Sequence, residues 1–193
     1  MLKPVTLSGH VVRLVPLSMG HLDAFCDVGL KPSIWAHNAW PVRSRADMQA
    51  YIQKALDAQA AGHMLPFATT LSDTGEVVGS TRFGAIDLVN RRMEIGWTWI
   101  TPAWQRTAIN TEAKLLMLRY AFDEIGCQRV EWKTDALNEH SRNAILRLGA
   151  QFEGMLRSHM IREDGSWRDT VYYSVLKEEW PAVEAGLIRK LDR

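Results

Sequence analysis

The residues from 104 to 121 combine a polar loop with the start of an amphipathic helix, and together they could hold a phosphate. The loop reads Gln105-Arg-Thr-Ala-Ile-Asn-Thr111, and the apolar side chains that follow at helical spacing are Ala113, Leu116, Met117, Tyr120 and Ala121. The first turn of a helix presents N–H groups without a partner in the helix, at the positive end of its dipole. Such a turn readily binds an anion. The spacing therefore predicts a pyrophosphate site at Gln105 to Thr111.

A second helix start follows a predicted strand over residues 129–134. Asn138 is a favourable N-cap, Ser141 lies three residues further on, and the helix is expected to end at Gly149. Both polar side chains are thus expected at the mouth of a cleft beside the strand. Two interpretations stay open: these side chains satisfy only their own helix, or they also contact a bound molecule.

These segments, with several others, resemble the GNAT superfamily of acyl-CoA N-acyltransferases, and within it the RimJ/RimL type of ribosomal-protein N-terminal acetyltransferases. The resemblance covers nearly the whole chain and rests on Arg13-Leu-Val-Pro-Leu17, Glu94-Ile-Gly-Trp97, Asn138-x-x-Ser141, Leu148-Gly-Ala150, Glu153-Gly-Met-Leu-Arg157 and Arg168-Asp-Thr-Val-Tyr-Tyr-Ser174. It implies direct transfer of acetyl from acetyl-CoA to a primary amine, without a metal or a covalent intermediate. The residues it assigns to acetyl-CoA are Gln105, Arg106, Thr107, Ala108, Ile109, Asn110, Thr111, Asn138 and Ser141.

The chain departs from the family pattern in the cofactor loop and at the position of the tyrosine acid. The superfamily's loop usually reads Gln/Arg-x-x-Gly-x-Gly/Ala, and Ala108 and Asn110 stand at the two small positions here. Glycine lets a backbone approach phosphate closely, so binding in the usual pose requires helical backbone angles at both residues. Many relatives carry a tyrosine acid where this chain has Ile145. By resemblance to the RimL-like branch, the hydroxyl of Ser141 is expected to protonate the leaving thiolate.

Glu94 is the first candidate for the general base, because relatives often have a glutamate on the strand before the cofactor loop. The alternative is a structural carboxylate paired with Arg91 or Arg92. A second glutamate of the RimL branch is replaced by Met160, and the neighbouring His159 is expected on the opposite face of its strand, exposed.

Aromatic residues in the loop between the first two predicted helices are expected to line the acceptor side. Trp35 and Trp40 stand where the family admits its acceptor, and aromatic walls suit a peptide or an apolar amine. Tyr173 is the third candidate for acceptor binding, although Tyr172 and Tyr173 alternate faces and the sequence does not distinguish them. Arg106, Lys114 and Arg142 are candidates for the phosphates of CoA, with Arg106 preferred, and the alternative for each is a solvated cation on a helix surface.

Composition excludes several other functions. The chain has 193 residues, 47% of them hydrophobic, which suits a single domain over residues 1–193. The net charge of +1 gives no field for nucleic acid or an acidic membrane. Cys26 and Cys127 are isolated, which argues against a disulfide framework or a zinc site. No leader or membrane-spanning run is found, so we expect a cytoplasmic protein, with a homodimer left open.

The order of hydrophobic periods predicts an α/β fold. A strand over residues 10–17 is followed by helices starting at Ser18 and Ser44, a meander over 67–71, 77–86 and 93–100, a helix over 110–125 and a strand over 129–134. A short helix from Asn138, a hairpin of 152–162 and 167–176, and a helix over 178–191 complete the chain. The resemblance implies a mixed, mostly antiparallel sheet of about seven strands, splayed at its centre and flanked by helices. The edge near Trp99 to Thr101 would then be free to pair with the amides of pantetheine.

The leading hypothesis is an N-acetyltransferase acting on a protein N-terminal α-amine. Two alternatives remain: a detoxifying acetyltransferase of a small amine or antibiotic, and an acyl-CoA-binding module without turnover, which the altered loop and the missing glutamate would suit. Fold alone does not separate these functions.

Overall fold

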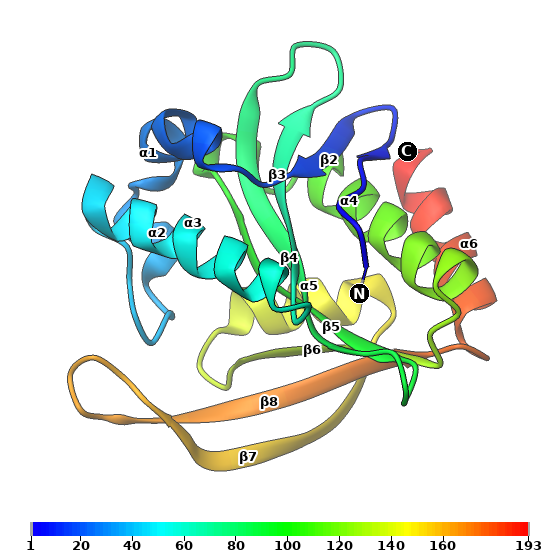
Figure 1. Cartoon of the computed structure of the whole chain (residues 1–193). Coiled ribbons are helices and arrows are strands. Elements are labelled where there is room, and N and C mark those ends of the chain that lie inside the picture. Colours follow the sequence, from blue (N-terminus) through cyan, green and yellow to red (C-terminus); the bar gives the residue numbers. More distant parts are fainter. Residues whose placement is uncertain (1, 193) are drawn as a thin grey trace.

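Residues 2–192 of the computed structural model form one mixed sheet of eight strands with helices on both faces (Figure 1). The order across the sheet is β1-β2-β3-β4-β5-β6-β8-β7. All neighbouring strands are antiparallel except β5 and β6, which are parallel. The strands are β1 (Leu7–Ser8), β2 (Val12–Pro16), β3 (Leu65–Leu71), β4 (Val77–Asp87), β5 (Arg92–Ile100), β6 (Arg129–Asp135), β7 (Gln151–Ile161) and β8 (Trp167–Leu176).

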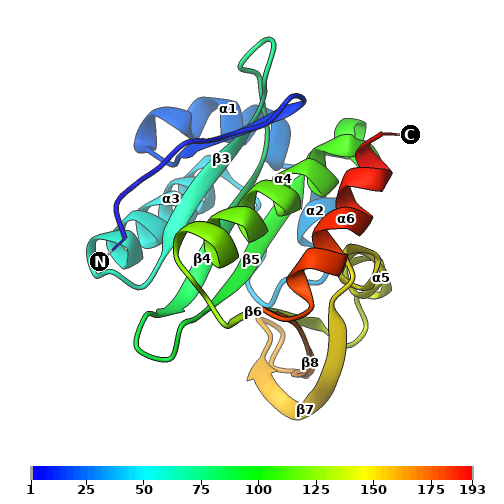
Figure 2. The same ribbon diagram turned by 90° about the vertical axis from the view of Figure 1, so that its right-hand side faces the viewer.

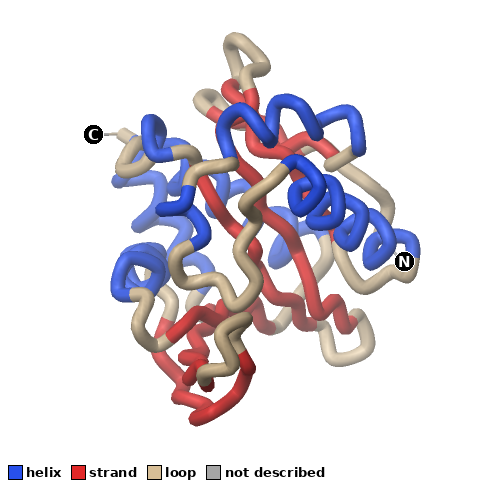
Figure 3. The backbone as a smooth tube through the Cα atoms, turned by 90° about the vertical axis from the view of Figure 1, so that its left-hand side faces the viewer, coloured by secondary structure: helices blue, strands red, loops and turns tan. Residues whose placement is uncertain are grey.

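Two groups of helices cover the two faces of the sheet. Figure 2 shows α4 (Ala108–Arg119) and α6 (Trp180–Leu191) side by side across one face, with α5 (Glu139–Leu148) near them. Figure 3 shows the opposite face, covered by α1 (Leu22–Gly29), α2 (Pro32–Trp35) and α3 (Arg45–Ala60). Each face buries its own apolar cluster, around Phe83 and Ile95 under α4 and around Phe25 and Trp99 under α1 and α3. Among residues 2–192 there is no helix with the length and apolarity needed to cross a membrane.

The centre of the sheet opens between β5 and β6. Their register joins Arg92 to Arg129, Met93 to Val130 and Glu94 to Glu131, and stops there. β5 continues to Ile100 and β6 to Asp135, so both strands have an unpaired edge beyond this point. The fold class predicted from the sequence, including the central splay, is confirmed.

A bulge in β5 marks the start of the open part. Trp97 has a φ of 51°, and the register between β4 and β5 shifts there. Gly84 on β4 leaves room for the Trp97 ring, because a Cβ at Gly84 would lie 2.4 Å from a ring carbon. The extra residue moves the side chains after it to the other face, which is how Trp99 comes to pack under α1 and α3.

Most elements lie where periodicity predicts them, and the differences are local. Ser44 caps α3 in a capping box with Asp47, as expected from Ser44-Arg-Ala-Asp47. The short β1 makes the sheet one strand wider than expected. Residues 33–40, expected as a loop, contain the end of the one-turn helix α2, which begins with Pro32 at a position where proline suits a helix.

Candidate active site

The N-terminus of α4 has the features of an anion site. Thr107 is the N-cap, and its Oγ1 accepts from the Ile109 N–H at 3.4 Å and donates to the Trp104 carbonyl at 2.7 Å. The first turn holds no acidic residue. Arg106 precedes the cap with a φ of 61° and is exposed, while Gln105 Nε2 donates to the Ile100 carbonyl at 3.0 Å. The loop is therefore tied to the end of β5 and leads into α4, whose first turn carries no acidic side chain.

Ala108 and Asn110 both lie inside α4 with helical backbone angles, so neither position requires glycine here. The Oδ1 atom of Asn110 is buried and accepts no hydrogen bond from the residues described. The Ile109 side chain is fully buried in the core under α4, so this residue can offer a ligand only its backbone N–H, which also contacts Thr107 Oγ1 at 3.4 Å.

Asn138 caps α5, as predicted. Its Oδ1 accepts from the Ser141 N–H at 3.0 Å. The half-buried Ser141 therefore lies in the first turn of α5, directly after β6 ends. Ile145, one turn later, belongs to the core, so a tyrosine at this position would need a different environment. The catalytic assignment of Ser141 stays a prediction.

Glu94 stands at the point where β5 and β6 separate. Its side chain is 4% exposed, and its Oε2 lies 2.8 Å from Nζ of Lys133, whose side chain is 32% exposed. The partner of Glu94 is therefore Lys133 on β6, and neither Arg91 nor Arg92. Burial raises the pKa of Glu94 above its ordinary value, and the Lys133 ammonium opposes that rise. A carboxylate in this setting can accept a proton from an incoming ammonium.

The wall beside Glu94 is aromatic and positively charged. The Trp97 ring centroid lies 6.0 Å from Nζ of Lys133 and 5.8 Å from the guanidinium carbon of Arg82. Arg82 is buried, and its guanidinium carbon lies 4.1 Å above the ring of Tyr51 from α3. These contacts are within cation–π range, so Trp97 is held between β4 and β6 at the edge of the splay.

The structure corrects two of the three acceptor residues. Trp35 is 4% exposed, and its indole N–H donates to the Gly29 carbonyl at 2.8 Å, so it packs in the core under α1 and α3. Tyr173 is 1% exposed in the other core and its hydroxyl accepts from Arg142. Tyr172 takes the opposite face and is half-buried beside Lys133, its partner across the ladder. Trp40 is 68% exposed and remains a candidate.

The loop that carries Trp40 is tied to the turn of the β7–β8 hairpin, which extends below α3 in Figure 1. The Glu163 N–H donates to the Ala39 carbonyl at 3.0 Å, and both guanidinium Nη atoms of Arg43 contact the Glu163 carboxylate, at 2.9 and 2.7 Å. The hairpin and the α2–α3 loop thus close one side of the face that carries Glu94.

A buried lysine stands on the other face of β4 and β5. Nζ of Lys114 donates to Oγ1 of Thr81 at 2.7 Å and of Thr98 at 2.8 Å, and no carboxylate among residues 2–192 forms an ion pair with it. Burial lowers the pKa of Lys114 to about 7. Lys114 therefore points at the sheet, and the expectation that it meets a CoA phosphate is wrong.

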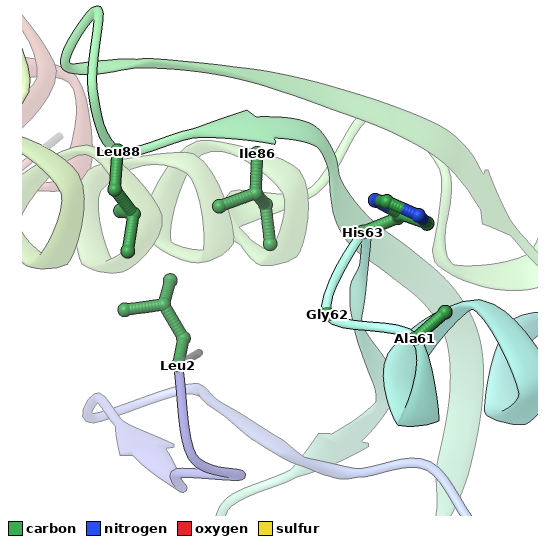
Figure 4. A pocket seen from close by; sticks show the side chains of 6 residues that line it. All are labelled: Leu2, Ala61, Gly62, His63, Ile86 and Leu88. Atoms are coloured by element: carbon green, nitrogen blue, oxygen red, sulfur yellow. The ribbon is translucent and has the colours of Figure 1, made fainter.

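One other hollow lies away from this site. A shallow pocket between the N-terminal segment, α3 and the β4–β5 turn is lined mostly by apolar residues, with Leu2, Ile86 and Leu88 converging in Figure 4. It contains none of the candidate residues. In the part of the chain that the structure describes, no group of three His, Cys, Asp or Glu side chains is placed to hold a metal ion.

Sequence reasoning missed Lys133 and Arg168. Lys133 alternates with Trp132 and Thr134 on a predicted strand, which is the usual pattern of a solvated residue. The crossover helix offered a usable signal. It makes the strand before it, β5, parallel to the strand after it, β6, and their register sets Lys133 opposite the residues that follow Glu94.

A helix N-terminus beside two parallel strands that separate is an arrangement that can hold a long, phosphate-bearing acyl carrier with its acyl end near Glu94. The family model described as acetyltransferase (GNAT) domain matches residues 12–151. The chain therefore belongs to the GNAT family and is an N-acetyltransferase of the kind that uses acetyl-CoA.

Individual relatives agree with this assignment. A GCN5-related N-acetyltransferase of Brucella melitensis has a solved structure with a TM-score of 0.89 and 32% identity, covering 98% of this chain and 86% of that one. RimJ of Mycobacterium smegmatis, solved in complex with CoA-disulfide, shares the fold with a TM-score of 0.79 at 24% identity, covering 97% and 93% of the two chains. A Bacillus subtilis protein named "Putative ribosomal N-acetyltransferase YdaF" is 37% identical over 106 residues, 55% of this chain and 57% of that protein. The similarity to the Brucella melitensis protein agrees with membership of the GNAT family, and the similarity to RimJ is one of fold.

Proposed function

We propose that this enzyme transfers the acetyl group of acetyl-CoA to the α-amine of a protein N-terminus. The observation that carries the proposal is the separation of β5 from β6 just after Glu94, with the N-terminus of α4 beside it. The pyrophosphate would lie against the first-turn N–H groups of α4, and pantetheine along the free edge of β5 near Trp99 to Thr101. The absence of acidic residues in that first turn supports this fit.

The acceptor class is inferred from the strength of base that the site offers. An α-amino group has a pKa near ~8 and is roughly a tenth neutral at pH 7, whereas a lysine side chain near ~10.4 is almost wholly charged. A single carboxylate therefore suffices for an N-terminal amine. The relative YdaF is named a putative ribosomal N-acetyltransferase, which is compatible with a protein acceptor.

In the proposed reaction, the amine nitrogen forms a bond to the thioester carbon and the carbon–sulfur bond breaks. Glu94 accepts the proton that the amine loses. Ser141 donates a hydrogen bond to the sulfur as negative charge develops there, which is acid assistance of the leaving group. Trp40 contacts the acceptor from the loop between α2 and α3.

The test is release of free CoA from acetyl-CoA with a panel of N-terminal peptides, small primary amines and aminoglycosides, with product masses to locate the acetyl group. Turnover on peptide α-amines supports the proposal. Turnover on small amines alone would reassign the enzyme to detoxification. Measurable CoA binding without turnover on any member would indicate a binding module.

A further inference from the structure

On one face of β6 and β8, two guanidinium groups lie near a single carboxylate, that of Asp135. The register pairs Lys133 with Tyr172 and Asp135 with Thr170, so these four side chains share the face on which Glu94 lies. Two residues further along β8, Arg168 points to the same face. Lys133 is neutralised by Glu94 at 2.8 Å. Glu131, on the same face, is paired with Arg129 at 2.9 Å, so the carboxylate that the ion pairs place nearest Arg168 is that of Asp135.

Asp135 already has a stronger partner than Arg168. Its Oδ2 lies 2.6 Å from an Nη of Arg162, and its Oδ1 accepts from the Leu137 N–H at 2.9 Å. Nε of Arg168 lies 3.9 Å from the same Oδ2, which is too long for a hydrogen bond. The Arg168 side chain is nevertheless only 12% exposed. A single carboxylate thus stands between two guanidinium groups, and one positive charge is left over.

Two polar atoms from residues on the same face of β8 also lack partners. Nε of Arg168 is buried and donates to no atom of residues 2–192. Oγ1 of Thr170, a fully buried residue, also has no hydrogen-bond partner among these residues. A buried donor without an acceptor is costly, and more so when it carries charge. A carboxylate accepts several hydrogen bonds and matches the fork of a guanidinium. The missing partner therefore has the chemistry of an anion.

The unsatisfied guanidinium is close to the candidate base. Glu94 and Arg168 are near enough to act on each other's pKa: Arg168 favours the ionised form of Glu94, and Glu94 favours the charged form of Arg168. Burial is the larger influence on Arg168 and lowers its pKa. An acceptor whose amine reaches Glu94 would carry a group only a few bonds away into reach of Arg168.

We propose that Arg168, supported by Thr170, binds a carboxylate of the acceptor, so that the preferred acceptor is an amine with a carboxylate a few bonds from the nitrogen. This deepens the proposed function and rests on it. An acidic side chain in the first two residues of a peptide, or the α-carboxylate of a free amino acid, offers this chemistry. In either case the anion neutralises Arg168 while Glu94 takes the proton from the amine.

The experiment compares acceptors in matched pairs that differ only in the carboxylate. One pair of peptides begins with Glu or Gln, a second has Glu or Gln at position two behind Ser, and the third is a free amino acid against its amide. For each enzyme we measure the ratio of kcat/KM for the acid to that for the amide. Wild type is expected to favour the acid in at least one pair by about tenfold or more, the size expected for a charge-assisted hydrogen bond.

Arg168→Gln is expected to reduce this ratio to below about threefold, and Arg168→Lys to an intermediate value, because lysine keeps the charge and loses the fork. Arg189→Gln on α6 removes an exposed arginine of the opposite face and should keep the wild-type ratio. A purely structural Arg168 would lower both members of a pair equally and leave the ratio unchanged. Should Arg168→Gln fail to fold, Thr170→Val tests the same ratio.

The outcomes for the two proposals are distinct. The carboxylate subsite is refuted if wild type acetylates acceptors without preferring any acid, or if the preference survives in Arg168→Gln. Failure to acetylate any amine would instead refute the proposed function. The pair that shows the preference identifies the source of the carboxylate as a peptide side chain or a free amino acid.

Discussion

Replacing Lys133 with Met should shift the acid limb of the pH profile toward higher pH. Lys133 places its ammonium 2.8 Å from the Glu94 carboxylate, whose side chain is 4% exposed. Burial raises the pKa of Glu94, and this ammonium is the main influence opposing the rise. Methionine has a similar length and no charge. In Lys133→Met the ionised form of Glu94 loses its counter-charge, so the pKa of Glu94 must increase.

The size of the shift follows from the distance. Two unit charges 2.8 Å apart interact by about 6 kcal/mol at an effective dielectric constant of about 20, which is an upper bound of about 4 pH units. Lys133 is about one-third exposed, so water screens much of this interaction. A nearby opposite charge typically shifts a carboxyl pKa by about 1–3 units. We therefore expect the limb to move up by about 1–2 units, with a tenfold loss of kcat/KM at acidic pH for each unit.

The assay is kcat/KM for one peptide acceptor between pH 5 and 9, for wild type, Lys133→Met and Lys133→Arg. The acceptor's own ionisation affects all three enzymes equally, so the difference between profiles reports Glu94. Lys133→Arg keeps the charge and should keep the limb near its wild-type position. An unchanged limb in Lys133→Met, in a folded protein that still binds CoA, would mean that Glu94 is not the base.

Four further variants test the remaining assignments. Ser141→Ala should lower kcat by about a hundredfold or more with little change in CoA affinity, whereas loss of a purely structural serine would affect the melting temperature and not kcat. Ala108→Glu should abolish the rise in melting temperature caused by CoA, which corresponds to about 2.7 kcal/mol at a hundredfold excess over Kd; an unchanged rise would place the phosphates elsewhere. Trp40→Ala should raise KM for the acceptor but not for acetyl-CoA, and equal changes in both would contradict its role. Lys114 has a folded-state pKa of about 7 against about 10.5 in the unfolded chain, so the unfolded state binds more protons between these pH values. In urea unfolding, the stability of wild type relative to Lys114→Met should therefore increase by about 2 kcal/mol from pH 7 to pH 9. Parallel pH dependences of the two proteins would show that Lys114 is charged when folded.

Periodicity predicted most of the fold because most elements have one apolar face and a clear signal at their ends. Ser44 and Asp47 start α3, and Gly149 ends α5 with a φ of 102°. The two-residue β1 has no period to detect. The helix α2 begins at Pro32 and is only one turn long, so it is too short for a helical period to show.

The lining of the site was harder to predict because it depends on the direction of single side chains. Tyr172 and Tyr173 alternate on β8, and only the register against Lys133 determines which of them is buried. Trp35 is the last residue of the short helix α2, which turns its indole toward the Gly29 carbonyl and into the core. Such outcomes depend on how strands and helices pack together, and no local pattern in the sequence contains that information.

The position of α4 relative to the open edge of β5 is fixed by two buried charged residues as well as by apolar packing. The Glu112 carboxylate accepts from the N–H groups of His10, Val11 and Val12 at 2.8, 2.7 and 2.7 Å, which anchors the helix to the segment before β2. Lys114, two residues later, points toward a different side of the helix and bonds threonines of β4 and β5. Apolar contacts are non-directional, so they limit rotation of the helix about its axis less than hydrogen bonds do. Anchored on two sides, α4 holds its first-turn N–H groups in one orientation toward the splay, which is what a pyrophosphate site requires.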